Sequence, residues 1–179
     1  SIMKYTVAND DLKLKNKNGL YCFLPYEKLD KKGKAVFKIG MTTQDFANRI
    51  ENYHSYYPMG VYMVFFLSFL KKRVPADVDK MKEQLKLEKA RFEYIEKELF
   101  ELVVKNEGKR IKFPSRPSQS WLFPSEWFYT DVKTLQISFE EIQKKHGGKL
   151  LSFHLDDIGN NFKNNKKDKR EKYLSEIVY

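Results

Sequence analysis

Residues 19–40 constrain the fold more than any other segment, because two short apolar runs there flank a polar loop. The runs at 20–24 and 35–39 are rich in aromatic and β-branched residues, which favour strands. Gly33 lies among charged residues in the loop between them, as is typical of a turn. The segment therefore predicts a β-hairpin.

A helix and a further strand should follow this hairpin. The threonine pair at 42–43 can cap a helix that starts after Gly40, and apolar residues then recur at helical spacing. Residues 61–70 form the most apolar run of the chain, about half as long as the roughly 20 residues that a membrane-spanning helix needs. We therefore expect a buried strand there, and a three-stranded core sheet with a helix inserted before its third strand.

The hairpin and the expected helix direct three polar side chains toward one patch. Alternate residues of a strand face opposite sides, so Tyr21 and Lys38 can share one face of the paired strands. Arg49 follows in the helix. A phenol, an ammonium group and a guanidinium group in one place suit a phosphate.

The order of these motifs resembles a known family. Gly19-Leu20-Tyr21, Lys38-Ile39-Gly40, Arg49 and the later Glu126-Trp127-Phe128 are similar to the motifs of the GIY-YIG nuclease superfamily, in the branch whose second motif reads KIG. The resemblance covers roughly residues 19–130. The chain departs from the superfamily at Lys38, which stands where the second motif has tyrosine.

The resemblance implies roles for several side chains in cleaving a phosphodiester. Tyr21 would orient or deprotonate the attacking water, and Arg49 would stabilise charge on the phosphoryl transition state. Lys38 would either lower the pKa of the phenol or contact the phosphate itself. His54 is a secondary candidate, for protonating the leaving group or for contacting DNA. Glu126 is interpreted mainly as a structural residue of its motif.

The resemblance also implies a metal ligand, a glutamate on the helix that follows the third strand. Such a carboxylate would hold Mg²⁺ or Mn²⁺ together with waters and the phosphate. Glu96 is the preferred ligand, because the local sequence IEKEL matches the branch best, and Glu88 is the alternative.

The helix that carries these glutamates should span residues 78–105. Its apolar stripe consists of Met81, Leu85, Phe92, Ile95, Leu99 and Val103. At about 100° per residue, Glu88 falls near the middle of that stripe and Glu96 about 60° from it. Three other acidic residues should point away from the protein: Glu93, Glu98 and Glu101.

The C-terminal half contains a basic loop, a strand and a helix. Residues 109–124 read as an irregular loop, because three prolines oppose regular structure. Residues 126–130 form a short aromatic strand, and Asp131 caps a helix that runs through Lys145 and stops at Gly147. The aromatic residues of this region either stack on bases or close the core: Trp121, Phe123, Trp127, Phe128 and Tyr129.

The composition favours a polyanionic partner. The chain has 179 residues and a net charge of +10, from 34 Lys and Arg against 24 Asp and Glu. The basic residues that we expect to contact DNA are Arg110, Lys112, Arg116, Lys166, Lys167 and Arg170. Cys22 is the only cysteine, which excludes a disulfide framework, and no signal peptide is visible. We expect an intracellular protein, in the cytoplasm or nucleus, or a virion protein, without membrane association.

These observations predict one α/β domain at 19–150, with a lead-in at 1–18 and a basic tail at 151–179. The domain should be a small mixed or antiparallel sheet flanked by helices, with a C-terminal helical extension. The favoured function is metal-dependent hydrolysis of DNA phosphodiesters. Because Lys38 replaces a tyrosine, the alternative is a catalytically weak nucleic-acid-binding or structural protein, such as a minor part of a viral particle assembled through the tail.

Overall fold

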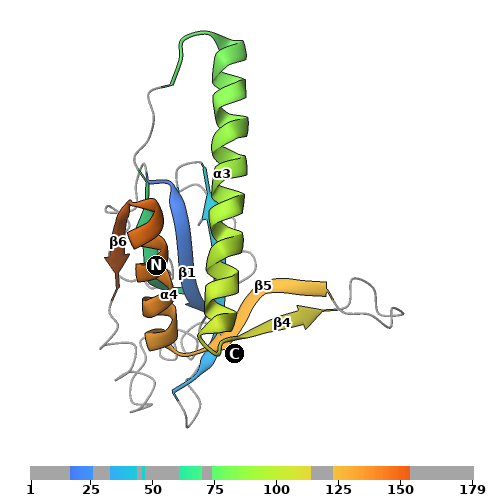
Figure 1. Ribbon diagram of the computed structural model, residues 1–179, viewed down its shortest axis with the longest axis vertical. Coiled ribbons are helices and arrows are strands. Elements are labelled where there is room, and N and C mark those ends of the chain that lie inside the picture. Colours follow the sequence, from blue (N-terminus) through green and yellow to red (C-terminus); the bar gives the residue numbers. More distant parts are fainter. Residues whose placement is uncertain are drawn as a thin grey trace, which may run out of the picture.

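The computed structural model describes residues 17–25, 33–43, 46, 61–69, 74–113 and 123–153. In these ranges the chain forms one six-stranded sheet and two helices, so the α/β class is confirmed (Figure 1). The strands are β1 (Gly19–Pro25), β2 (Ala35–Thr42), β3 (Val61–Ser68), β4 (Lys109–Phe113), β5 (Phe123–Thr130) and β6 (Lys149–Ser152), and the helices are α3 (Val78–Lys105) and α4 (Val132–His146). The strands pair antiparallel in the order β4-β5-β2-β1-β3-β6.

The prediction of three strands undercounts the sheet. The central β2-β1-β3 unit is the expected one, but β5 and β4 extend it on one side and β6 on the other. β4 and the start of β5 lie where three prolines predicted an irregular loop. Pro124 fits into β5 because it lies near the start of the strand, next to an irregularity in the β4–β5 register. β6 has only four residues, too few for a readable alternation.

The predicted hairpin is confirmed as β1 and β2, in a register that pairs Tyr21 with Gly40. β2 does not end at Gly40 as expected. It continues to Thr42, which pairs with Gly19, so this threonine belongs to the sheet ladder rather than to a helix cap. Of the helix predicted to follow, the structure describes Phe46, which is helical.

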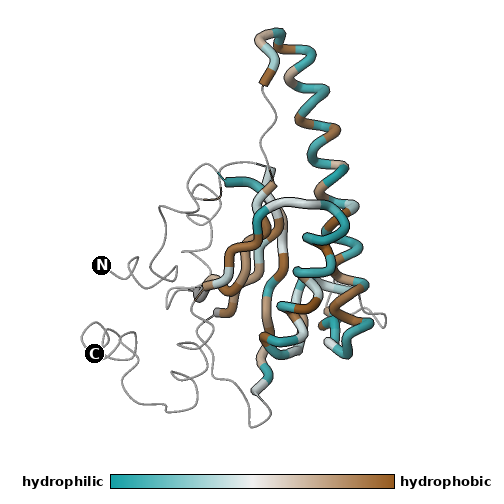
Figure 2. Tube along the Cα trace, turned by 60° about the vertical axis from the view of Figure 1, so that its left-hand side comes forward, coloured by the Kyte–Doolittle hydropathy of each residue, from teal (hydrophilic) through white to brown (hydrophobic). Residues whose placement is uncertain are grey.

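Helix α3 has the predicted bounds and is capped by Asp77, whose side chain accepts hydrogen bonds from the amides of Asp79 and Lys80. Only its C-terminal half packs on the sheet, and its N-terminal half extends beyond it (Figure 2). The predicted apolar stripe is therefore buried in part: Phe92, Ile95, Leu99 and Val103 are buried, whereas Leu85 is 45% exposed.

The sheet buries side chains on both faces. One face packs against α3 and α4 around a large core that includes Cys22, Phe37, Ile39 and Phe128. The other face carries a second, aromatic cluster: Tyr21, Phe23, Phe46, Met63, Phe66 and Phe153. Neither described helix is long and apolar enough to cross a membrane.

Candidate functional site

The two glycines of the sequence motifs each have a structural reason. A Cβ at Gly40 would lie 2.5 Å from the Cζ and hydroxyl oxygen of Tyr21, so only glycine lets the phenol ring lie across β2. A Cβ at Gly19, whose φ is 149°, would lie 1.8 Å from the carbonyl oxygen of Leu67 on β3. The motif glycines therefore pack the three central strands together.

Tyr21 belongs to the aromatic cluster and is 1% exposed. Its ring centroid lies 5.0 Å from that of Phe46 and 6.1 Å from that of Phe23. The residues of α3 that pack on the sheet belong to the core on the opposite face. The structure thus does not bring Tyr21 and Glu96 together in one patch, since the sheet lies between them.

A group of charged side chains instead gathers where β5 separates from β2. The register between these strands ends with Lys38 opposite Trp127, and Glu126 follows directly on β5. Lys38 donates to the Glu126 carboxylate in an ion pair, and the two side chains are 14% and 47% exposed. Glu126, interpreted from the sequence as mainly structural, is therefore an electrostatic partner of Lys38.

An irregularity in the β4–β5 pairing directs Glu126 toward this group. The register shifts between Arg110 and Lys112, which leaves extra residues on β5. The Ser125 hydroxyl fixes this bulge, because it donates to the carbonyl of Ile111 at 2.7 Å and accepts from the amide of Trp127 at 3.1 Å. Bulges of this kind re-aim side chains and are common next to functional sites.

Arg110, on β4, also contacts this bulge of β5. Its Nε donates to the carbonyl of Ser125, and its guanidinium lies 4.6 Å from the ring centroid of Phe100 and 5.7 Å from that of Phe128. Burial lowers the pKa of Arg110, opposed by the carboxylates of Glu126 and Glu96. Arg110 is predicted from composition to contact DNA, but here it is half-buried and stacked.

Glu96 lies on α3 one turn before Phe100, and its carboxyl group interacts electrostatically with Glu126, Lys38 and Arg110. Its pKa is raised to about 7, chiefly because burial disfavours the charged form and next because of repulsion from Glu126, while Lys38 and Arg110 act in the opposite sense. Within the described residues its carboxylate makes no hydrogen bond or ion pair. A half-buried, unpaired carboxyl group beside a second carboxylate is typical of functional sites.

The alternative ligand Glu88 lies two turns earlier on the part of α3 that extends beyond the sheet. It is half-buried in a shallow depression with Lys80, Leu87 and Arg91, about 12 Å along the helix from Glu96. Glu83 also lines this depression, together with the cations Lys80 and Arg91, but every residue that lines it belongs to α3, so among the described residues no second element encloses it. The geometry therefore favours Glu96 over Glu88.

Several predicted site residues lie outside the described residues. These are Arg49, His54, Arg116, Lys166, Lys167 and Arg170. Lys112 is described and is exposed on β4, as a phosphate contact requires.

The donor set around Glu96 is small for a metal ion. No group of three or more His, Cys, Asp or Glu side chains that could hold one occurs in the described ranges. Glu96 and Glu126 nevertheless offer carboxylate oxygens, which hard cations such as Mg²⁺ prefer, and a cation held by one or two carboxylates plus substrate oxygens is a common arrangement. The residues present therefore fit such an ion.

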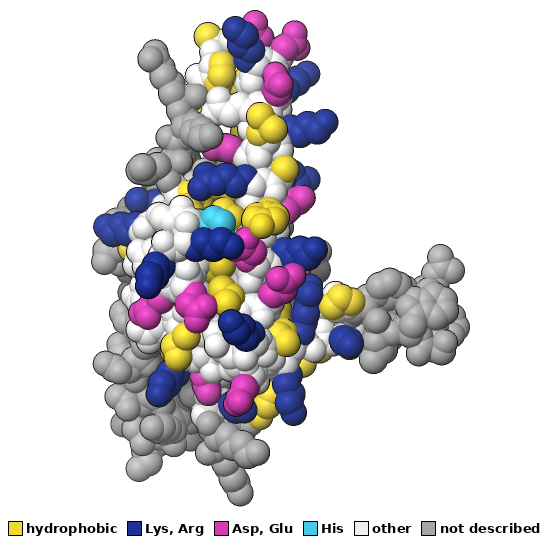
Figure 3. All heavy atoms as spheres, in the orientation of Figure 1, with side chains coloured by type: hydrophobic (Ala, Val, Ile, Leu, Met, Phe, Trp, Pro, Cys, Tyr) yellow, Lys and Arg dark blue, Asp and Glu magenta, His cyan; other side chains and the backbone are white. Residues whose placement is uncertain are grey.

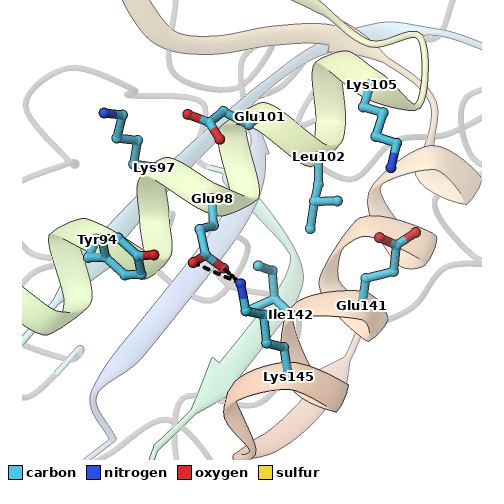
Figure 4. A pocket seen from close by; sticks show the side chains of 9 residues that line it. All are labelled: Tyr94, Lys97, Glu98, Glu101, Leu102, Lys105, Glu141, Ile142 and Lys145. Atoms are coloured by element: carbon cyan, nitrogen blue, oxygen red, sulfur yellow. Dashed lines mark hydrogen bonds and ion pairs between the residues drawn. The ribbon is translucent and has the colours of Figure 1, made fainter.

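A groove of about 450 Å³ lies between α3 and α4, away from this group (Figure 4). Glu98 points across it to α4, where Lys145 and His146 hydrogen-bond its carboxylate at 3.1 and 2.9 Å. Glu98 was expected to point into solvent, and that expectation is wrong, because α4 packs beside α3 at this position. Acidic and basic side chains alternate over this face (Figure 3), so it forms no patch of a single charge.

Comparison with protein-family models, with curated proteins and with solved structures finds no match to this chain.

Proposed function

We propose that this protein is a metal-dependent endonuclease of the GIY-YIG type that hydrolyses DNA phosphodiesters. The observation that carries the proposal is the Glu96 carboxyl group, which is half-buried, unpaired among the described residues and close enough to Glu126 for mutual repulsion. Holding two carboxylates in this way destabilises the folded protein at neutral pH. A bound cation removes that penalty.

Glu96 is the proposed metal ligand, and Glu126 is proposed to contribute a second carboxylate if Lys38 leaves it for a phosphate. A divalent cation held there would supply Lewis-acid polarisation of the phosphoryl group. Lys38 and Arg110 add positive charge where negative charge develops in the transition state. Arg49 is proposed to add to this charge stabilisation.

Tyr21 is proposed to orient the attacking water through its hydroxyl group, which lies over Gly40, two residues from Lys38. Its burial keeps the ring fixed, which suits a positioning role. The same burial restricts access by water and substrate, and the sheet lies between Tyr21 and Glu96, so this role requires the scissile phosphate to be within reach of both the hydroxyl group, on the Gly40 side of β2, and the metal at Glu96.

A second function is favoured by the position of Tyr21. It lies on the face of the sheet opposite α3, and Lys38 is engaged by Glu126. A chain with these features can bind nucleic acid without cleaving it, as a nucleic-acid-binding or structural protein such as a minor component of a viral particle.

Cleavage of supercoiled plasmid separates the two functions. The wild-type protein is expected to nick plasmid DNA with Mg²⁺ or Mn²⁺ and not with EDTA, and Glu96→Ala should abolish nicking. Glu101→Ala is the matched control, because Glu101 is exposed on the same helix. A wild-type protein that binds the plasmid but never cuts it with either metal supports the binding function instead.

A further inference from the structure

The sheet face away from α3 and α4 carries aromatic and basic side chains on its β2, β5 and β4 strands. Trp127 and Tyr129 flank Phe128 in the sequence, and since alternate residues face opposite sides, they lie on the face opposite the Phe128 core. Trp127 confirms this by packing edge-on against Phe23 of the aromatic cluster, at 6.1 Å between ring centroids. Both residues are half-buried, so part of each is exposed to solvent.

Three lysines join these rings on the same face. Lys38 pairs directly opposite Trp127, and Lys109 directly opposite Tyr129. Lys34 places its Nζ 5.7 Å from the Tyr129 ring centroid, and the Lys38 Nζ lies 6.0 Å from that of Trp127. We call these five residues the aromatic–lysine platform: Lys34, Lys38, Lys109, Trp127 and Tyr129.

We propose that the aromatic–lysine platform binds single-stranded nucleic acid, with bases stacked on Trp127 and Tyr129 and phosphates held by the lysines. Aromatic rings interleaved with basic residues are an arrangement by which proteins bind unpaired strands, because every base offers a ring face and every phosphate a charge. The excess of positive charge over the whole chain agrees with a polyanionic occupant.

The spacing of the two rings favours an unpaired strand over a duplex. Residues two apart on a strand are separated by about 7 Å, whereas successive bases in a duplex are about 3.4 Å apart. Neighbouring bases can therefore cover both rings only when the nucleic acid is extended and its bases are unstacked. A duplex can reach the lysines but leaves the rings without stacking partners.

The platform adjoins the proposed active site through Lys38, which belongs to both. A strand stacked on Trp127 passes the point where Lys38 meets Glu126. This inference rests on the proposed function in that nucleic acid is the substrate, and it narrows the substrate to DNA with an unpaired segment. Binding by the platform does not require a metal ion or cleavage.

Fluorescence anisotropy in EDTA tests the platform apart from catalysis. The probes are a labelled oligothymidylate and a labelled duplex of the same length, titrated with the full chain at low salt. The wild-type protein should bind the single strand more tightly than the duplex. Trp127→Leu and Tyr129→Leu should each weaken single-strand binding by about tenfold, while duplex binding changes little.

Two further variants separate stacking from folding. Trp127→Phe and Tyr129→Phe keep a ring and should retain most of the single-strand affinity, and thermal melting identifies any variant that fails to fold. If Trp127→Leu unfolds because the contact between Trp127 and Phe23 is lost, Tyr129→Leu carries the test alone. Tyr94→Leu is the matched control, because Tyr94 is a 61% exposed ring on α3, and its affinity should be unchanged.

Three results overturn the platform: equal or tighter binding of duplex by the wild type, unchanged single-strand affinity in folded leucine variants, or no binding of the single strand. Failure of the proposed function looks different, because it would leave these affinities intact and show only as absent cleavage in Mg²⁺ or Mn²⁺.

Discussion

The ring of Tyr21 lies across Gly40 on the neighbouring strand, with no room for a side chain at position 40. This contact explains why tyrosine and glycine occur in the two motifs, whatever chemistry the site performs. It links β1 to β2 and fixes the phenol within the aromatic cluster. The contact therefore contributes to both stability and the position of the hydroxyl group.

Gly40→Ala is expected to destabilise the protein by about 1–3 kcal/mol, because the new methyl group overlaps the phenol ring. Thermal or urea unfolding measures the change. A double-mutant cycle supplies the control: the cost should be much smaller in a Tyr21→Ala background, where the overlapping ring is absent. An equal cost in both backgrounds would show that the ring does not lie across Gly40.

The raised pKa of Glu96 makes a prediction about stability and pH. The pKa of Glu96 is about 7 in the folded protein, compared with an ordinary glutamate pKa of 4.5. Between pH 4.5 and pH 7 the folded state therefore binds more protons than the unfolded state. Stability should therefore fall as the pH rises through this window. Glu96→Gln removes the cost of ionising a half-buried carboxyl group beside Glu126. The substitution should therefore stabilise the metal-free protein at pH 8 by on the order of 1 kcal/mol, after discounting for partial exposure.

The stabilisation should disappear at pH 4, where wild-type Glu96 is also protonated in the folded state. Thermal melts in EDTA at the two pH values measure this difference. Glu101→Gln, at an exposed position on the same helix, should show no comparable gain at pH 8. A Glu96→Gln variant less stable than wild type at pH 8 contradicts the assigned environment.

Metal binding should stabilise the wild-type protein at pH 8. A ligand that binds only the folded state at 100 times its Kd adds about 2.7 kcal/mol, and Mn²⁺ at Glu96 also relieves the repulsion from Glu126. The melting temperature is expected to rise with Mn²⁺ in the wild type and in Glu101→Gln, but not in Glu96→Gln. Equal shifts in all three proteins would place the metal elsewhere.

The Glu98 contact with α4 should stabilise the protein in a pH-dependent way. Hydrogen bonds from His146 and Lys145 lower the pKa of Glu98 to about 2, with His146 the larger contribution. The contact therefore stabilises the fold above pH 4.5, and the stabilisation is lost as the pH falls toward 2. Glu98→Gln should lower the urea midpoint at pH 6 by more than it does at pH 3, and a difference independent of pH would contradict this.

Much of the fold is readable from the sequence because its signals are local. The β1–β2 hairpin follows from two aromatic and β-branched runs, and α3 follows from its long periodic pattern. β4 and β6 were missed because their own five and four residues carry little periodicity, and β6 is further defined by pairing with β3, which is distant in the sequence. The strand predicted at 126–130 is β5, and only its start was missed, because Pro124 there falls in the segment predicted to be an irregular loop.

The site was harder to predict, because it depends on a register shift and on which face of the sheet each element covers. The sequence places Glu96 about 60° from the apolar stripe of the helix, and in the structure its side chain is half-buried. The pairing of Lys38 with Glu126 could not be predicted, since the β5 bulge at Ser125 that directs Glu126 leaves no sequence signal beyond a proline and a serine. The separation of Tyr21 from Glu96 by the sheet likewise follows only from the three-dimensional packing.

The most direct measurement of the central claim is the single-turnover cleavage rate of labelled DNA with saturating Mn²⁺. Glu96→Gln should lower this rate by roughly a hundredfold or more with little change in DNA affinity, because it removes ligand charge but preserves volume. Glu101→Gln should cleave at the wild-type rate. If Glu96→Gln cuts DNA as fast as the wild type, Glu96 does not hold the catalytic metal and the proposed nuclease site is wrong.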